Sequence, residues 1–308
     1  MIRIMQTIKP TTMSTAQYSV ELVAPLVCEI GENPLWHSDS KQLFFLDIPA
    51  GEVHIYDPST STVTLHSRTR VSGGFTIQQD GSLLLFQDGH ISLLKPDGTL
   101  REVGSGLCPR NDRFNDVIAD PEGRVFAGAM GGNGRLLRFD LDGSVTEMFD
   151  GCGIPNGMGF TPDLKGMYFT DSVPRKIYYF DYDRRSGSLT NRRTFAEIPR
   201  EEGAPDGMCV DEDGYVWTAI WFGGRLKRYA PDGTLEREVM LPVTQTSSVT
   251  FGGADLTDMY VTTASTNEAD SLAPPGYDRT AARGGGLYHV SVQGTRGKLP
   301  FRSRLNFS

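Results

Sequence analysis

The sequence predicts an all-β protein, a six-bladed β-propeller with a central channel. Three observations support this fold class: a hairpin-like unit recurs along the chain, its copies are nearly evenly spaced, and no long amphipathic helical period interrupts them. Successive copies begin 40, 42, 42, 49 and 43 residues apart, at Leu43, Leu83, Val125, Met167, Val216 and Met259. A period of about 40–50 residues with roughly four strands is typical of propeller blades, which stack around an axis.

Each unit is a short apolar or aromatic run, a turn, a second run and a polar turn. The first five copies are QLFFLDIPAGEVHIYDP, SLLLFQDGHISLLKPDG, RVFAGAMGGNGRLLRFDLDG, GMYFTDSVPRKIYYFDYD and YVWTAIWFGGRLKRYAPDG. The sixth is DMYVTTAS followed by GGGLYHVSV, and the Pro/Gly-rich stretch 273–286 between them predicts a long loop inside the last blade. Runs rich in Val, Tyr, Phe and Ile predict strands. Asp-Gly pairs such as Asp80-Gly81 and Asp213-Gly214 supply the positive φ of tight turns.

A β-sandwich of hairpins is the structural alternative, but it does not require equal spacing or position-matched polar residues. We expect residues 1–17 to be a disordered lead, with Met13 as an alternative start, and residues 18–308 to form a single propeller domain. The four cysteines, Cys28, Cys108, Cys152 and Cys209, form no CxxC pair, so we expect reduced thiols in a cytoplasmic protein.

The net charge of −8 and pI near 5.2 argue against a nucleic-acid partner, because no basic surface is available to neutralise phosphates. No apolar run approaches the roughly 18 residues of a membrane span, and the N-terminal stretch lacks the continuous apolar segment of a secretory signal. We therefore expect no membrane partner, and a monomer or weak oligomer.

Four polar residues occupy equivalent places in four repeats. Glu32, Asn115, Asn156 and Asp206 each lie 10 or 11 residues before a strand-like run. If these positions open the innermost strand of each blade, a ring forms at one end of the channel, completed by Ser72 or Gly73 and by Ser248. Each residue alone also fits a turn, since Asn156 and Asp206 precede Gly. The repeat-matched placement favours the ring.

In an empty narrow funnel that holds two carboxylates and two amides, the carboxylates are desolvated and repel each other. A divalent cation relieves that cost. Their oxygens suit Ca²⁺, Zn²⁺, Mn²⁺ or Mg²⁺. Arg113, two residues before Asn115, reaches the same funnel if it is not a surface charge, and Asp116 either orients a ligand or fixes its own loop.

The chain resembles the regucalcin/gluconolactonase family, also called luciferin-regenerating or SMP-30-like proteins, from about residue 22 to residue 299. The resemblance rests on GENPLW, NDRFNDVIADPEGRVFAGAM, IPNGMGFTPD, FDYDRRSGSLTNRR, APDGMCVDEDGYVW, GGRLKRYAPDG and SSVTFGGADLTDMYVTTA. It implies a six-bladed propeller in which Glu32, Asn156 and Asp206 bind one divalent metal, while Arg113 and Asn115 hold the substrate. It also implies a metal-dependent hydrolase that opens a sugar lactone to its hydroxy acid.

In the corresponding mechanism Asp206 is the general base for an attacking water, and Arg113 and Asn115 orient the ring, while the metal polarises the lactone carbonyl. Typical animal members carry a longer loop with an acidic substrate-contacting residue where this chain has only Gly131-Gly132-Asn133-Gly134, which leaves the choice of sugar open. Trp221 either walls the pocket or packs between blades.

The sequence gives little support for other catalytic chemistries. The chain has no G-x-S-x-G elbow, no Walker or dinucleotide glycine pattern, and no histidine at a predicted channel-mouth position. Two alternatives stay open, namely a non-catalytic calcium-binding regulatory protein and a phosphotriesterase or other ester hydrolase on the same metal site.

Overall fold

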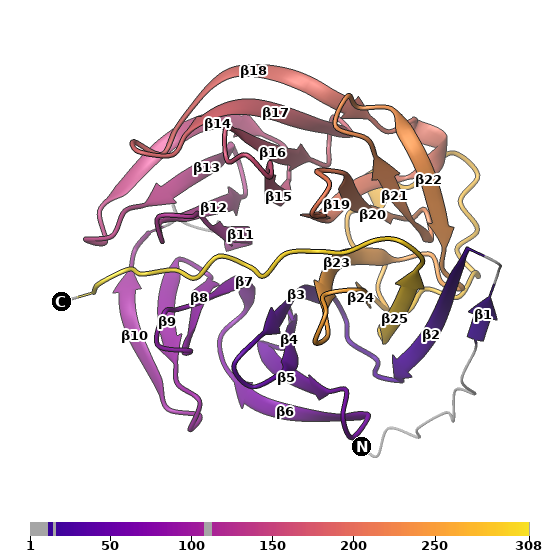
Figure 1. The fold of residues 1–308 in the computed structure, drawn as a ribbon, viewed down its shortest axis with the longest axis horizontal. Helices are drawn as coiled ribbons and strands as arrows, with labels where there is room; N and C mark the ends of the chain where they lie inside the picture. Colours follow the sequence, from indigo (N-terminus) through magenta and orange to yellow (C-terminus); the bar gives the residue numbers. More distant parts are fainter. Residues whose placement is uncertain (1–11, 15–16, 108–112, 308) are drawn as a thin grey trace.

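A computed structural model of the protein describes residues 12–14, 17–107 and 113–307. The chain forms six antiparallel sheets arranged around an axis (Figure 1), which confirms the predicted six-bladed propeller. Cys108 and residues 1–11 and 15–16 of the predicted lead lie outside the described residues, and Thr12–Ser14 form β1. The domain limits 18–308 stay a prediction. No helix in the described part of the chain is long and apolar enough to cross a membrane.

Five of the six blades are built from four consecutive strands, and the six predicted runs are the second strand of each blade. The first blade contains β3 (Gly31–His37), β4 (Gln42–Asp47), β5 (Glu52–Asp57) and β6 (Thr62–Arg68). The second contains β7 (Ser72–Ile77), β8 (Leu83–Gln87), β9 (His90–Leu94) and β10 (Leu100–Ser105). The third contains β11 (Arg113–Ala119), β12 (Val125–Met130), β13 (Gly134–Phe139) and β14 (Val145–Cys152).

The fourth and fifth blades follow the same order, and the sixth adds strands from the N-terminal end of the chain. The fourth contains β15 (Pro155–Phe160), β16 (Gly166–Asp171), β17 (Lys176–Asp183) and β18 (Ser188–Glu197). The fifth contains β19 (Ala204–Val210), β20 (Val216–Trp221), β21 (Arg225–Tyr229) and β22 (Leu235–Met240). The sixth contains β23 (Thr246–Gly252), β24 (Asp258–Thr263), β25 (Leu287–Val292), β2 (Tyr18–Ala24) and β1. Two 3₁₀ turns, η1 (Arg200–Glu202) and η2 (Asp270–Leu272), complete the regular structure of the described residues.

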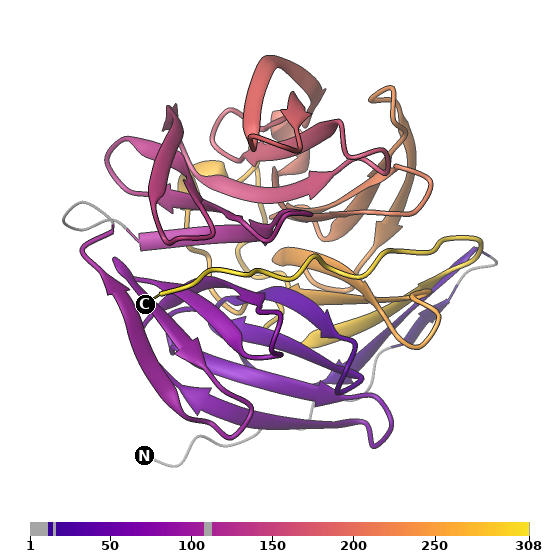
Figure 2. The same ribbon diagram turned by 60° about the vertical axis from the view of Figure 1, so that its left-hand side comes forward.

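The sixth blade closes the ring by joining the two ends of the chain. Strand β2 pairs antiparallel with β25, so an N-terminal strand finishes a C-terminal sheet (Figures 1 and 2). The innermost strands β3, β7, β11, β15, β19 and β23 contact one another in turn around the channel. Every predicted site position lies on one of these six strands.

The hydrophobic core lies between blades rather than within them. Alternate side chains of a second strand face opposite neighbours: Leu83 and Leu85 pack toward the first blade, whereas Leu84 and Phe86 pack toward the third. Both faces of these strands are therefore buried, which explains why their sequences read as continuous apolar runs.

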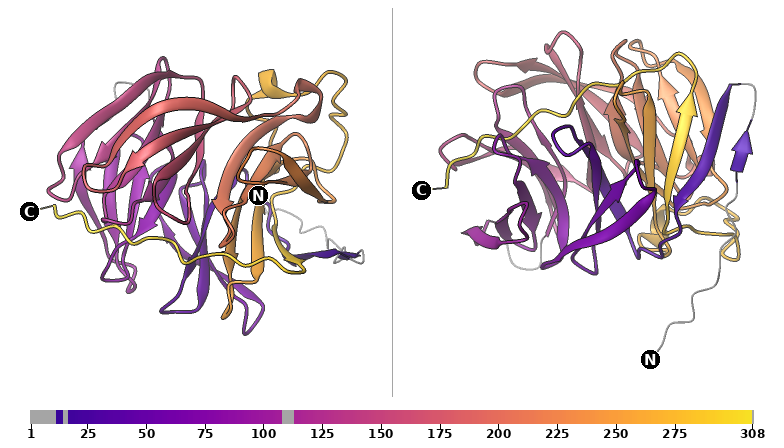
Figure 3. Two further views of the ribbon diagram at one scale, coloured as in Figure 1. Left: turned by 45° about the horizontal axis from the view of Figure 1, so that its top comes forward. Right: turned by 60° about the horizontal axis from the view of Figure 1, so that its bottom comes forward.

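The segment after β25 crosses one end of the propeller (Figure 3). Backbone N–H groups of Gly297, Ser303 and Arg304 donate to carbonyls of three different blades, at Leu256, Ile77 and Gly123. This segment closes a mainly apolar cavity of about 370 Å³ inside the channel, lined by Leu35, Val117, Met158, Met208, Val249, Leu299 and Phe301 among others.

Candidate functional site

The inner strands are irregular where the predicted site residues lie. The pairing register shifts between Phe114 and Val117 in β11, between Pro155 and Met158 in β15, and between Pro205 and Met208 in β19. The same shift follows Glu32 in β3. Such bulges bend a strand and re-aim its side chains, so each polar residue turns toward the axis.

Glycine follows Asn156 and Asp206 because neighbouring inner strands approach closely there. An ideal Cβ on Gly157 would lie 2.6 Å from the Asp206 carbonyl oxygen, and one on Gly207 would lie 2.1 Å from Ser248 Oγ. Asn156 and Asp206 lie within strands, so their interpretation as ordinary turn residues is wrong.

The structure brings Glu32, Arg113, Asn115, Asn156 and Asp206 to one cavity of about 80 Å³. Glu32 is 4% exposed, and Asn115, Asn156 and Asp206 are each 6% exposed. The other lining residues are Ile30, Ile48, Met130, Ile154, Ser172, Trp221, Glu268, Ala269 and Leu272. None of these is a histidine, in keeping with the sequence.

The expected six-membered ring is wrong at two positions. Ser72 donates its hydroxyl to the Arg70 carbonyl, 3.0 Å away, and Gly73 packs against β11, where an ideal Cβ would lie 1.9 Å from the Phe114 carbonyl oxygen. Ser248 lines the larger apolar cavity instead. Close packing of neighbouring inner strands therefore occupies the places where the second and sixth blades would contribute.

A chain of hydrogen bonds fixes the two amides. Arg113 Nη1 donates to Asn115 Oδ1 at 2.8 Å, and Asn115 Nδ2 donates to Asn156 Oδ1 at 2.8 Å. Asn156 Nδ2 donates to Ser172 Oγ at 2.8 Å, and that hydroxyl donates to the Pro205 carbonyl at 2.7 Å. Because Nδ2 of each amide is fixed as a donor, the other side-chain atom of each amide is the oxygen Oδ1.

Two aspartates hold the loops that lead into these strands. Asp47, at the end of β4, accepts the backbone N–H groups of Glu29 and Ile30 at 3.0 and 3.1 Å. Asp171, at the end of β16, accepts those of Gly153 and Ile154 at 3.1 Å each. The same aspartate-to-backbone hydrogen bonding in two blades fixes the start of β3, which carries Glu32, and of β15, which carries Asn156.

Burial and neighbouring negative charges disfavour the ionised forms of the two acids of the site, Glu32 and Asp206. Burial and the charge of Asp116 raise the pKa of Glu32 well above its usual range, against the opposing effects of the Asn33 N–H and Arg113. Burial, Glu32 and Asp116 likewise raise the pKa of Asp206 well above its usual range. Within the described residues neither acid forms an ion pair with Arg or Lys, and the charge of Arg113 offsets theirs only in part.

This donor set fits a hard divalent cation. Two buried carboxylates that repel each other, beside an amide oxygen held in place, are the oxygen ligands that such ions take. No group of three His, Cys, Asp or Glu suited to a metal occurs in the described part of the chain. An ion here therefore depends on Asn156 as a third ligand beside Glu32 and Asp206.

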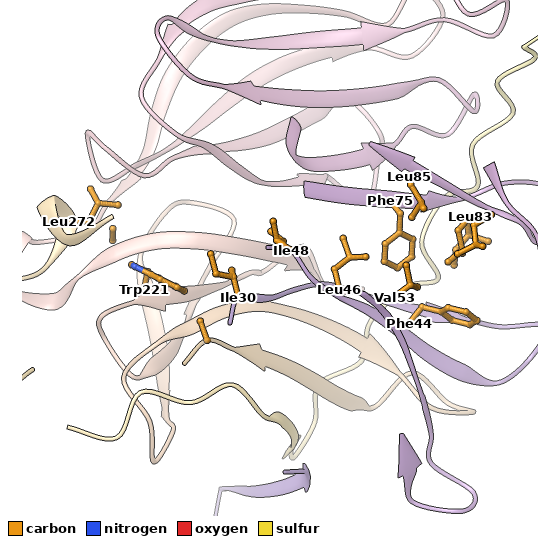
Figure 4. Packing of buried hydrophobic residues seen from close by; sticks show 14 of the residues in the cluster. Ile30, Phe44, Leu46, Ile48, Val53, Phe75, Leu83, Leu85, Trp221 and Leu272 are labelled. Carbon is orange, nitrogen blue, oxygen red and sulfur yellow. The ribbon is translucent and has the colours of Figure 1, made fainter. Parts of the chain in front are cut away.

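Trp221 has both of its expected roles. It is 6% exposed within an apolar cluster with Ile30 and Ile48 (Figure 4), and it also lines the cavity. Its Nε1 donates to the Glu268 carbonyl oxygen at 3.1 Å. The short connection at 131–134 stays outside the lining, and Asn133 Nδ2 donates instead to Asp150 Oδ2 of its own blade at 2.9 Å.

Sequence reasoning missed two polar lining residues. Ser172 follows the second strand of its blade, and its role depends on an Asn in the neighbouring inner strand, which the repeat pattern does not show. Glu268 belongs to the insertion of the last blade, which has no counterpart in the other five units.

A model of the family described as "SMP-30/Gluconolactonase/LRE-like region" matches residues 30–265. This chain belongs to that family. It is 44% identical over 289 residues to the pentonolactonase XacC of Haloferax volcanii, covering 92% of this chain and 98% of that protein. It is 33% identical over 295 residues to human regucalcin, covering 92% and 97%.

Solved structures of the family share the fold. A luciferin-regenerating enzyme superposes with a TM-score of 0.86 at 26% identity, covering 96% of this chain and 100% of that one. A regucalcin from Agrobacterium tumefaciens, described as a calcium-binding protein, superposes with a TM-score of 0.83 at 24% identity, covering 94% and 98%. The six-bladed architecture of this SMP-30-like chain is therefore that of its family.

Proposed function

We propose that this protein is a divalent-metal-dependent lactonase that opens a sugar lactone to its hydroxy acid. The observation that carries the proposal is the convergence of Glu32, Asn156 and Asp206 from three blades on one cavity that also contains Arg113 and Asn115. The 44% identity to a pentonolactonase over nearly the whole chain supports the same substrate class.

Glu32, Asn156 and Asp206 would hold the metal, because these buried residues line one cavity and no ion pair neutralises the two carboxylates within the described residues. Bound there, the ion would supply Lewis-acid polarisation of the lactone carbonyl. Ca²⁺, Zn²⁺, Mn²⁺ and Mg²⁺ all remain compatible with this mixed carboxylate and amide set.

The chain's own groups account for the remaining steps. Arg113 and Asn115 orient the lactone through its hydroxyls, and the planar guanidinium suits paired oxygens. Asp206 takes a proton from water, whose oxygen bonds to the carbonyl carbon. The ring C–O bond then breaks, and the proton passes from Asp206 to the departing alkoxide, which gives the open hydroxy acid.

A pH-stat assay of acid release tests the proposal. Pentono- and hexonolactones are supplied to protein stripped of metal and then reloaded with each of the four ions. We expect turnover only in reloaded protein, and none in Asp206→Asn. Asp213→Asn is the matched control, because Asp213 is an exposed turn residue of the same blade. Full activity of Asp206→Asn, or of the stripped protein, would refute the mechanism.

The second candidate function is a non-catalytic calcium-binding protein, which the similarity to regucalcins favours. The same site would then bind Ca²⁺ without turning over lactone. Calorimetric Ca²⁺ binding that Asp206→Asn abolishes, together with no acid release from any lactone under any ion, would favour this candidate over the lactonase.

A further inference from the structure

The insertion between β24 and β25, residues 264–286, lies over the cavity that holds the site residues. Glu268, Ala269 and Leu272 from this insertion are part of the cavity lining. It is the one lining segment of the described chain that does not come from a blade strand or from the short loops next to one.

Hydrogen bonds from three sides fix this insertion. Trp221 Nε1 donates to the Glu268 carbonyl, and Gln245 Nε2 donates to Asn267 Oδ1 at 2.9 Å. Arg175 Nη2 donates to the Leu272 carbonyl at 3.0 Å. Glu268 is therefore held at the mouth by its backbone and its neighbours, which leaves its own side chain out of the anchoring.

The Glu268 carboxylate acts across the mouth on Arg113. Burial lowers the pKa of Arg113, and nearby carboxylates oppose this effect. The charge of Glu268 opposes it most strongly, followed by those of Glu32, Asp116 and Asp206. Both residues line the cavity, and no ion pair joins them within the described residues.

We propose that Glu268 is a specificity-determining residue that selects polyhydroxylated lactones, by accepting hydrogen bonds from substrate hydroxyls opposite Arg113. This inference rests on the proposed lactonase function and deepens it. It also gives the cavity an acidic contact that the short 131–134 connection does not provide.

The chemistry of the pair defines the substrate class. An ionised carboxylate only accepts hydrogen bonds, whereas a guanidinium only donates them. A ligand that satisfies both must offer donors and acceptors together, as neighbouring hydroxyls do. A lactone without hydroxyls offers the Glu268 carboxylate no donor as it displaces water, which costs binding energy. The apolar walls of Ile48, Trp221 and Leu272 fit the C–H faces of such a compact polyol.

Kinetics of Glu268→Ala and Glu268→Gln on two substrates test the inference. One substrate is a pentono-1,4-lactone, and the other is γ-butyrolactone, which has the same ring without hydroxyls. Glu268→Ala should lose about 10- to 100-fold in kcat/KM on the pentonolactone, mainly through KM, as expected for a lost charged hydrogen bond. Its kcat/KM on γ-butyrolactone should change by less than about twofold. Glu268→Gln should fall between Glu268→Ala and the wild type on the pentonolactone.

Asp270→Asn is the matched control. Asp270 is an exposed acid of the same insertion that pairs with Arg279 and does not line the cavity, so its neutralisation should leave both substrates unaffected. Equal loss on both lactones in Glu268→Ala, or no loss on the pentonolactone, would overturn the inference while the lactonase stands. A wild-type protein that opens neither lactone under any ion would overturn the proposed function, and this inference with it.

Discussion

Asp116 lines the larger cavity of the channel, and its neutralisation should stabilise the metal-free protein in a pH-dependent way. The residue lies on β11, lines the larger cavity and raises the pKa of both Glu32 and Asp206. Burial, opposed by Arg113, raises the pKa of Asp116 itself to about 7. Its charge therefore opposes folding whenever it is ionised.

The magnitude follows from linkage. The carboxyl has a pKa of about 3.9 in the unfolded chain and about 7 in the folded one. It therefore does not lower the free energy of unfolding below about pH 4, and the stability is lost as the pH rises from there through about 7. At 1.36 kcal/mol for each pKa unit, the raised pKa of Asp116 lowers the free energy of unfolding by about 4 kcal/mol at pH 8, where the folded carboxyl is ionised. The reduction is only about 1 to 2 kcal/mol at pH 5, where the carboxyl stays protonated in the folded protein. Asp116→Asn removes this cost and keeps the side-chain shape.

Urea unfolding of metal-stripped wild type and Asp116→Asn at pH 5 and pH 8 measures the effect. The variant should be the more stable protein at pH 8, and its advantage in free energy of unfolding should grow by about 3 kcal/mol between the two pH values. Asp213→Asn, in an exposed turn, should show no such growth. An advantage that does not change with pH, or a less stable Asp116→Asn at pH 8, would refute the electrostatic reasoning.

Three further changes test how the site is held. Ser172→Ala removes the acceptor of Asn156 Nδ2 and should weaken metal binding about 10- to 100-fold in calorimetry; unchanged affinity would show that the amide needs no such support. Gly207→Ala should lower the thermal midpoint by several degrees, because its Cβ would collide with Ser248. Gly104→Ala should change the midpoint little, because its Cβ would meet a movable Leu107 methyl at 3.0 Å and Ile91 Cβ at an ordinary 3.7 Å. Equal midpoints would contradict the close approach. Trp221→Phe removes the bond to the Glu268 carbonyl and should speed hydrogen exchange across 264–286; unaltered exchange would mean that the bond does not anchor the insertion.

The fold could be predicted because the same pattern of apolar strands and turns recurs in each blade of a propeller. Second strands such as β8 are buried on both faces, so their apolar runs stand out at a regular spacing. The closure by β2 leaves no comparable signal, because its partner β25 lies at the other end of the chain. A pairing between chain ends depends on tertiary contacts rather than on local pattern.

The site could be predicted only in part, for a related reason. Glu32 and Asp206 lie in equivalent repeats, so symmetry indicates that they meet. Equivalence also predicted Ser72 or Gly73, and Ser248, at the same ring, and there the close packing of inner strands overrides the repeat. Glu268 lies in an insertion outside the repeat, and only three-dimensional folding brings it to the cavity.

The stoichiometry and affinity of metal binding test the central claim most directly. Titration calorimetry, with elemental analysis of the loaded protein, compares wild type with Glu32→Gln and Asp206→Asn, and Asp213→Asn serves as control. We expect one divalent ion per wild-type and control chain, and at least about 100-fold weaker binding in each of the two site variants, because each removes one of only two carboxylate ligands. Wild-type affinity in both site variants would contradict an ion shared between Glu32 of the first blade and Asp206 of the fifth.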